Sequence, residues 1–324
     1  MKKAGDILKK ADVVQKAISR SKRKPDPVQE FSLSALTQKE DDTHYTQQGQ
    51  LVRLFDIRNQ SQDIGFIARL LTLATMPHSN PGDAENYTRI NGDYKFVMRR
   101  GEDTKLPYGS YPRLVLAWVC SEAVQTKARE LALGDSLSSF MRQLGLIPTG
   151  GRWGTIPNLR EQLKRLFNAR ISVSLIERDK RAFFDISKAY DLWWDHVQPT
   201  QVTLWKSTVT LSEEFFKEII EHPIPINMKI LKALKRSPLG LDLYMLFTYR
   251  VSYLKQPAYI PLSGLHQQFG AEYKDIKNFK RKVHREMLKI KLAWPQLNYE
   301  MHPGRLVLYP SQPSIPQLPP ADKR

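Results

Sequence analysis

The sequence lacks several features that are typical of nucleotide-hydrolysing enzymes, disulfide-rich proteins and membrane proteins. One of its 324 residues is cysteine, Cys120, which excludes a disulfide framework and a zinc site built on cysteines. None of the 16 glycines is followed by lysine, so the Walker A phosphate loop is missing. No stretch approaches the roughly 18 apolar residues of a membrane span, and no apolar region follows the N-terminal Met1-Lys2-Lys3. We therefore expect a cytoplasmic protein without a signal peptide.

The seven histidines are also too dispersed to form a paired metal motif. They are His44, His78, His196, His222, His266, His284 and His302. No two have the spacing that brings ligands together on a strand or a helix, which also argues against metal-assisted DNA nicking by paired histidines. A G-x-S-x-G elbow is missing as well. We expect no catalytic residues, no cofactor and no metal, although a site assembled in space stays open.

The charge of the chain favours an anionic partner. Lys and Arg number 50 against 33 Asp and Glu, so the formal net charge is +17 and the pI is about 9.8. Such an excess is typical of proteins that bind nucleic acid, although many basic proteins are simply basic.

The two ends of the chain differ in composition from the middle. Residues 1–24 hold nine Lys or Arg against Asp6 and Asp12, which predicts a flexible basic arm over residues 1–50. The arm could contact phosphates or remain a solvated tail. Residues 310–324 are rich in proline and predict a disordered tail.

Between these ends, several short signals predict individual elements. Phe66–Met76 is apolar and predicts a buried strand or short helix. Asn91-Gly92 predicts a hairpin turn, because both turn positions need positive φ. Val202–Leu211 resembles a strand, and Ser212 is suited to cap the helix that follows it.

One order of elements occurs twice: helix, strand, helix, helix, hairpin. The first copy comprises Pro112–Lys127, Glu130–Leu133, Leu137–Leu144, Thr155–Ala169, Ile171–Ile176 and Ala182–Ile186. The second comprises Leu239–Tyr253, Ala258–Pro261, Leu262–Phe269, Tyr273–Leu292, Leu297–Met301 and Arg305–Tyr309. This is the order of a winged helix-turn-helix, whose third helix enters the major groove while its hairpin wing follows the backbone. We predict an α+β fold with two tandem winged-helix domains, 51–200 and 201–309.

The third helix of the second copy carries the clearest binding signal. Its apolar face is predicted to hold Ile276, Phe279, Val283, Met287 and Ile290. Residues 274–291 contain eight Lys or Arg against Asp275 and Glu286. A solvated helix face normally mixes signs, so this face favours DNA over the alternative of a plain exposed surface. The predicted contacts are Lys274, Lys277, Asn278, Arg281, Lys282, Arg285 and Lys289.

The corresponding helix of the first copy has a weaker signal. We predict contacts from Asn158 and Arg165, although Arg165 could instead pair with Glu161 one turn away. The glycine-rich turn before it offers Arg152 and its backbone amides to a phosphate. Lys180, Arg181 and Arg305 border the two hairpin loops and complete the predicted site.

The region after residue 66 also resembles a known family. The resemblance is carried by Tyr111-Pro112-Arg113-Leu114-Val115-Leu116-Ala117-Trp118, Glu122-Ala123-Val124, Thr126-Lys127, Glu130-Leu131, Leu133-Gly134-Asp135-Ser136-Leu137-Ser138, Phe140-Met141-Arg142, Leu144-Gly145 and Pro148-Thr149-Gly150-Gly151-Arg152-Trp153-Gly154. These stretches are similar to the plasmid RepA-type replication initiators, over about residues 66–175.

The resemblance implies a sequence-specific initiator of plasmid replication. Such a protein binds repeated origin sites (iterons) in double-stranded DNA as a monomer, acts with the host initiator and replicative helicase, and represses its own gene as a dimer. The resemblance also implies that the second winged helix reads bases while the first makes dimer contacts. It further implies a bacterial, plasmid-associated location. The alternatives are a winged-helix transcriptional repressor without initiator activity and a replication enzyme, either a nicking relaxase or a primase.

Overall fold

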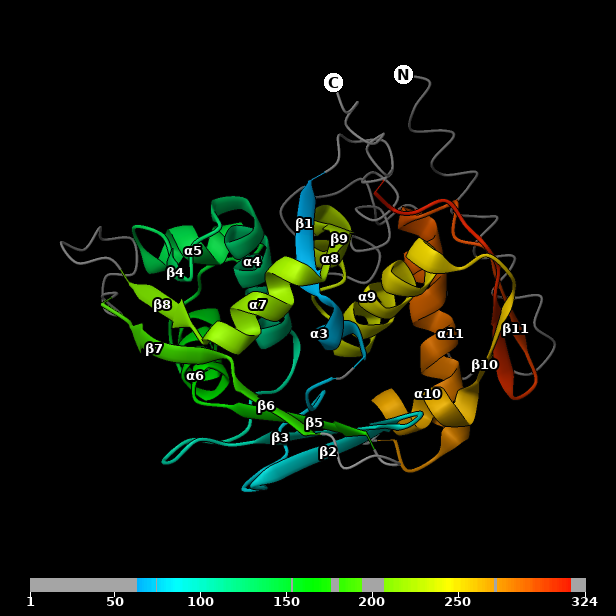
Figure 1. Ribbon diagram of the computed structural model, residues 1–324, viewed down its shortest axis with the longest axis horizontal. Coiled ribbons are helices and arrows are strands. Elements are labelled where there is room, and N and C mark those ends of the chain that lie inside the picture. The colour runs from blue at the N-terminus through cyan, green and yellow to red at the C-terminus, as the bar shows by residue number, and fades with distance from the viewer. Residues whose placement is uncertain are drawn as a thin grey trace, which may run out of the picture. The chain divides into compact units, whose positions relative to one another are not determined.

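Figure 1 shows the computed structural model, which describes residues 63–73, 75–152, 154–175, 181–193, 207–270 and 273–315. The chain divides into two units, Met1–Gln50 and Leu51–Arg324, and every described residue belongs to the second. The predictions for the basic arm, for Lys180 and for most of the C-terminal tail therefore lie outside the described residues.

The C-terminal part of the chain has the element order predicted for the second copy. It comprises α9 (Pro238–Tyr253), β10 (Ala258–Pro261), α10 (Leu262–Phe269), α11 (Ile276–Ala293), β11 (Tyr299–His302) and β12 (Arg305–Leu308). Strand β12 pairs antiparallel with both β10 and β11, so the sheet order is β10-β12-β11. Gly304 lies in the hairpin turn with φ +80°, a conformation that glycine adopts without strain. We call these six elements the second repeat.

The first copy has the same arrangement, but its closing hairpin is not the predicted one. The repeat comprises α4 (Ser110–Thr126), β4 (Glu130–Ala132), α5 (Leu137–Gln143), α6 (Thr155–Phe167), β7 (Ser187–Asp191) and β8 (Thr208–Leu211). Its sheet order is β4-β8-β7, which matches β10-β12-β11. Buried Leu131 lies opposite buried Val209, so apolar pairing between β4 and β8 closes this sheet. We call these six elements the first repeat.

The segments predicted as the first wing instead form β5 (Arg170–Leu175) and β6 (Arg181–Asp185). They join β2 (Asn86–Asn91) and β3 (Tyr94–Arg99) in an antiparallel sheet of order β2-β3-β5-β6, which lies at the lower edge of Figure 1. Phe96, Met98 and Ile171 are buried on one face of this sheet. Burial of these apolar side chains favours the pairing of β5 with β3. The predicted wing is therefore wrong, because pairing across the chain decided which hairpin closes the first repeat.

The β2–β3 hairpin occurs where Asn91-Gly92 predicted one. Asn91 pairs with Tyr94, so the turn is centred on Gly92 and Asp93, one residue later than predicted. Gly92 has φ +56° and occupies the first central position. The sheet also contacts the second repeat, through β2 and α10.

The remaining elements connect the two repeats. Phe66–Met76 contains both predicted alternatives, because β1 (Ile64–Ala68) leads directly into α3 (Arg69–Leu73). Strand β1 pairs antiparallel with β9 (Pro223–Asn227). The short helix α8 (Met228–Ala233) follows β9.

Helix α7 (Glu213–Glu221) begins as predicted. The Oγ of Ser212 accepts a hydrogen bond from the amide of Phe215 at 3.1 Å, and two glutamates occupy the first turn. Strand β8, which precedes α7, pairs with strands of the first repeat although it follows residue 201. Whether residues 51–200 and 201–309 fold as separate domains stays a prediction.

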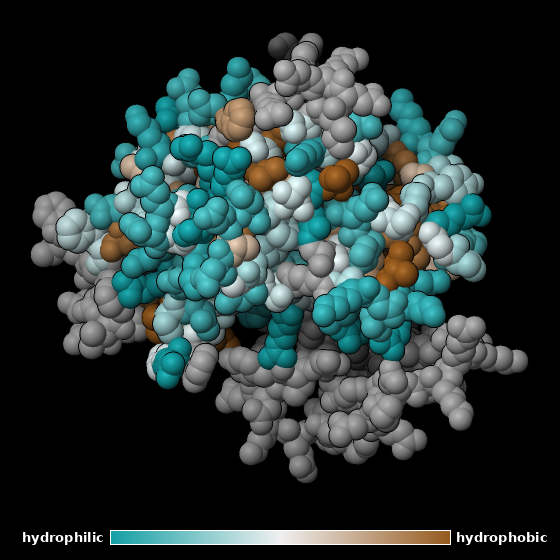
Figure 2. All heavy atoms as spheres, turned by 90° about the horizontal axis from the view of Figure 1, so that it is seen from below, coloured by the Kyte–Doolittle hydropathy of each residue, from teal (hydrophilic) through white to brown (hydrophobic). Residues whose placement is uncertain are grey.

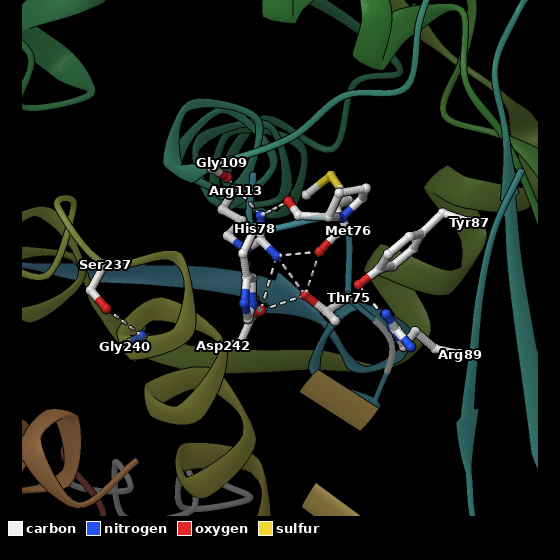
Figure 3. Close-up of polar contacts among 11 residues, drawn as sticks. Thr75, Met76, His78, Tyr87, Arg89, Gly109, Arg113, Ser237, Gly240 and Asp242 are labelled. Atoms are coloured by element: carbon white, nitrogen blue, oxygen red, sulfur yellow. Dashed lines mark hydrogen bonds and ion pairs between the residues drawn. The ribbon is translucent and has the colours of Figure 1, made fainter. Parts of the chain in front are cut away.

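A buried ion pair joins the first helices of the two repeats. Asp242 of α9 accepts hydrogen bonds from Arg113 of α4, at 2.7 Å from Nε to Oδ1 and at 2.9 Å from Nη2 to Oδ2 (Figure 3). Thr75 and His78, which precede β2, contact the same carboxylate, the Nε2 of His78 at 2.7 Å. Burial would raise the pKa of Asp242, but the Arg113 charge and the His78 hydrogen bond lower it to about 2.

Candidate nucleic-acid interface

The apolar face of α11 fixes which side of this helix meets solvent. Phe279, Val283, Met287 and Ile290 are fully buried, as their spacing predicted. Ile276 was predicted to join them but is 46% exposed. The helix begins at Ile276, where the Asp275 carboxylate caps the amide of Lys277 at 2.8 Å, so this residue lies in the first turn, outside the core contact.

The opposite face of α11 presents most of the predicted DNA contacts. Exposed residues are Lys274, Lys277, Asn278, Arg281 and Arg285, and Lys282 is half-buried. Within this set, the Arg281 guanidinium donates to the Asn278 Oδ1 at 2.6 Å. Arginine and asparagine are the side chains that form paired hydrogen bonds with guanine and adenine edges. The structure therefore assembles a compact donor surface on one side of this helix.

Neighbouring cations of α11 affect the ionisation of Lys282. Burial lowers the pKa of Lys282, and the charges of Arg285 and Lys289 lower it further, against an opposing effect of Glu286. An arriving anion would relieve this repulsion, because it would screen the like charges from one another.

Lys289 differs from the other predicted contacts. Its side chain is 14% exposed, and its Nζ lies 3.2 Å from the Oε2 of Glu286, a carboxylate with no exposed surface. The Nε of Arg285 lies 3.5 Å from the other oxygen of the same carboxylate. The sequence pattern placed Lys289 on the open face, but the buried charge of Glu286 holds it against the protein.

Helix α6 packs on α4 and forms hydrogen bonds with the chain that precedes α4. Its predicted apolar residues are all buried: Ile156, Leu159, Leu163, Leu166 and Phe167. Gln162 is also buried and accepts a hydrogen bond from the Tyr108 amide at 2.8 Å. Asn158 is exposed, as predicted.

Arg165 does not lie on the exposed face predicted for it. It is 8% exposed, donates to Glu161 at 2.8 Å and to the Leu106 carbonyl at 3.3 Å, and lies over the Tyr108 ring. The alternative ion pair with Glu161 is thus the one that forms. A tight contact with the chain before α4 buries this side chain, and the helical pattern alone could not indicate that contact.

The turn before α6 uses part of its own hydrogen-bonding capacity. Thr149 and Thr155 exchange side chain-to-amide hydrogen bonds at 2.9 Å, and the Thr149 carbonyl accepts from the Ile156 amide. The amides of Thr149, Thr155 and Ile156 are therefore occupied within the protein. Arg152 is exposed beside them.

Of the three cations predicted to contact DNA from the hairpins, Arg305 has a described side-chain contact. Arg305, at the start of β12, is exposed, and its guanidinium lies 5.3 Å from the ring centre of Tyr259. Arg181 begins β6 and so belongs to the four-stranded sheet rather than to a wing. Lys180 lies outside the described residues.

Figure 2 views the molecule from below Figure 1, and hydrophilic residues cover most of the described surface there. Hydrophobic residues form small separate spots on this face. Among the described residues, no helix is long and apolar enough to cross a membrane. The same residues contain no cluster of three or more His, Cys, Asp or Glu suited to a metal ion.

The sequence patterns did not predict that two acidic residues, Asp242 and Glu286, are buried. Each had a signal that could have revealed it. Asp242 is the one charged residue among the apolar positions of the first half of α9, and Glu286 is the one glutamate within the basic helix α11. A lone carboxylate in such a setting requires a partner, because an unpaired buried charge is costly.

The family comparison supports the resemblance found in the sequence. Residues 106–259 match the family model described as "Plasmid encoded RepA protein". The match includes the first repeat and α9, and it ends within β10, before α10 and α11. No curated protein matches the chain.

Solved structures extend the likeness in fold. A crystal structure of domain 2 and domain 3 of RctB has a TM-score of 0.50 at 13% identity, with 75% of this chain and 96% of that chain covered. A second, of RctB domains 2-3, has a TM-score of 0.48 at 14% identity, with 74% and 94% covered. At this identity the first likeness shows a shared mixed α/β fold with small antiparallel sheets.

Proposed function

We propose that the protein is a sequence-specific double-stranded DNA-binding initiator of plasmid replication. The family match over residues 106–259 supports the plasmid setting. The observation that carries DNA binding is the exposed face of α11, where Lys277, Asn278, Arg281 and Arg285 lie opposite a fully buried apolar face.

The arrangement of both repeats supports winged-helix domains. In each repeat the third helix precedes a hairpin, and a short strand after the first helix pairs with the second strand of that hairpin. In the proposed complex, α11 enters the major groove and the Arg305 hairpin lies along the backbone. Helix α6 approaches a neighbouring groove with Asn158 and Arg152 in reach.

A binding titration on the full chain tests this proposal. Candidate duplexes come from the DNA that neighbours the gene, with scrambled duplexes of equal length for comparison. Arg281→Ala should weaken binding to the cognate site by about 1–3 kcal/mol and relax the preference at one base pair. Arg99→Ala removes an exposed cation from β3 instead and is the matched control. Equal, selective binding by a folded Arg281→Ala variant would contradict the assignment of α11.

The initiator and the repressor proposals differ in the DNA that each requires. An initiator should bind direct repeats of about two helical turns beside an AT-rich tract, and binding should support recruitment of the host initiator and helicase. Inverted repeats as the sole specific target would favour a winged-helix repressor. Origin-dependent replication of a test plasmid, with and without the gene, separates the two functions.

We further propose a monomer–dimer equilibrium in which the dimer binds inverted repeats and represses the gene. The β2–β3 hairpin is the candidate dimer surface, and its support is the exposure of Ile90 and Tyr94 on either side of the turn. Sedimentation over a concentration series should show the equilibrium, and Ile90→Glu should shift it toward monomer. A monomer at all concentrations with unchanged binding to inverted repeats would exclude this equilibrium.

The proposal includes no enzymatic activity. Its basis is the lack of a lysine-bearing phosphate loop and of paired histidines in the sequence. The purified protein should neither hydrolyse ATP nor cleave DNA. Mg²⁺-dependent nicking of supercoiled origin DNA by the pure protein would favour the relaxase alternative.

A further inference from the structure

The first turn of α9 is packed between elements of both repeats. Ser237 caps this turn, and its Oγ accepts a hydrogen bond from the amide of Gly240 at 3.1 Å (Figure 3). Asp242 follows two residues later and pairs with Arg113 of α4. The turn therefore carries one contact to the first repeat within a few residues of its own start.

The contact to the first repeat permits little freedom of orientation. Besides binding Asp242, the Arg113 guanidinium donates to the carbonyls of Gly109 at 2.6 Å and Met76 at 2.7 Å, and to the Thr75 hydroxyl at 2.6 Å. Both Arg113 and Asp242 are almost fully buried. A planar guanidinium with acceptors on every nitrogen fits one arrangement of its neighbours, because each hydrogen bond depends on direction.

The contact to α11 is on the other side of the same turn. A Cβ atom added at Gly240 would lie 2.9 Å from the Oε2 of Glu286, so only glycine permits this approach without a shift. An alanine here would require the carboxylate end of the Glu286 side chain, which is buried, to shift. Glu286 in turn holds the Lys289 and Arg285 side chains.

These contacts form a continuous path between the two third helices. Helix α6 packs on α4, and α4 meets the α9 turn through Arg113 and Asp242. The same turn meets α11 through Gly240 and Glu286. A purely apolar contact of similar volume would stabilise the protein at least as well, whereas a buried ion pair adds a requirement for one geometry.

We propose that the first turn of α9, through the positioning residues Gly240 and Asp242, sets the separation and orientation of α6 and α11. The protein consequently prefers one spacing between the two DNA half-sites. The spacing preference rests on the proposed function, whereas the fixed geometry can be measured without DNA.

A distance measurement between spin labels tests the geometry in the free full-length protein. Lys164→Cys on α6 and His284→Cys on α11 place labels at exposed positions outside the proposed DNA contacts. Burial raises the pKa of the Cys120 thiol to about 12, so this native cysteine does not react. The protein with an intact α9 turn should give one narrow distance distribution.

Asp242→Asn and Gly240→Ala should each shift or broaden that distribution. Asp242→Asn places an amide donor against the Arg113 donors, and Gly240→Ala forces Glu286 away while favouring the helix itself. Asp185→Asn is the matched control, because it removes a 2.8 Å pair with Arg170 on the exposed sheet. Unchanged distributions in folded Asp242→Asn and Gly240→Ala would overturn the proposal. Should Asp242→Asn fail to fold, Gly240→Ala alone decides.

A series of duplexes with base pairs inserted between the half-sites tests the consequence for DNA. Insertion of half a helical turn should weaken binding of the parent protein about tenfold or more, and the two variants should lose most of this dependence. A parent protein that binds no specific DNA would contradict the proposed function, while the label distances would still decide the positioning role. A spacing dependence that the variants retain would contradict the inference.

Discussion

The two repeats share an order of elements and a sheet order but differ in how their third helices are used. Helix α6 directs Gln162 and Arg165 inward, onto the chain that precedes α4. Helix α11 directs Arg281 and Arg285 outward and buries only one carboxylate, Glu286. The scaffold therefore does not determine the role of its third helix, because the polar residues on its two sides decide which surface remains for a partner.

The inserted strands β5 and β6 add a second difference. In the first repeat they separate α6 from the hairpin β7–β8, whereas the second repeat passes from α11 to β11 through a short turn. The insertion completes the sheet with β2 and β3, which contacts α10. The strands inserted in the first repeat thus belong to a sheet that contacts the second repeat through β2.

The largest expected loss of stability comes from a substitution in the buried face of α11. Val283→Asp should destabilise the protein by about 4 kcal/mol, because it buries an unpaired carboxylate at a position with no exposed surface. Ile276→Asp, in the exposed first turn, should change the free energy of unfolding by less than about 0.5 kcal/mol. Urea unfolding of both variants measures the difference, and equal effects would mean that the two faces of α11 are misassigned.

The pair that joins the repeats predicts a dependence on acid. The pKa of Asp242 is about 2 in the folded protein against 3.8 as a model value, so its charge adds about 2 kcal/mol of stability. Because the folded pKa is the lower one, this contribution is complete above pH 3.8 and is lost as pH falls toward 2. Denaturant midpoints from pH 6 to pH 2 should fall more steeply for the parent protein than for Asp242→Asn. Parallel curves would contradict the prediction.

Matched arginine substitutions sharpen the contrast between α6 and α11. Arg165→Ala should lower the free energy of unfolding by about 1–3 kcal/mol, because it leaves buried acceptors unsatisfied, and should leave DNA affinity nearly unchanged. Arg281→Ala should weaken DNA binding and leave the free energy of unfolding nearly unchanged. Thermal unfolding measures the stability of both variants, and DNA titration measures their affinity. A large loss of affinity in folded Arg165→Ala would show that Arg165 contributes to DNA binding.

The smallest effect concerns a single phosphate contact. Lys277→Ala should weaken binding to cognate and scrambled duplexes alike and reduce the salt slope by about one ion. Lys289→Ala should leave the slope nearly unchanged, because its ammonium group is held by Glu286. Titrations at several salt concentrations measure both slopes, and equal reductions would show that Lys289 also reaches the backbone.

Much of the local structure was predictable from the sequence. Of the ten apolar positions predicted to be buried in α6 and α11, nine are buried, and Ile276 is the exception because it lies in the first turn. Ser212 caps α7 as predicted, and Ser136 caps α5 in the same way. These features depend on residues within one or two turns of each other, which is why sequence reasoning finds them.

The sequence by itself determined the excess of positive charge, the resemblance to plasmid RepA-type initiators over about residues 66–175, the repeated order of elements and the apolar faces of the third helices. The tertiary structure alone decided which hairpin closes the first repeat, why Arg165 and Lys289 are held inward, and how Arg113 meets Asp242. Each of these depends on groups far apart in the chain. Strand pairing and buried charge pairs are selected by the partners that folding brings close, and no local pattern records that choice.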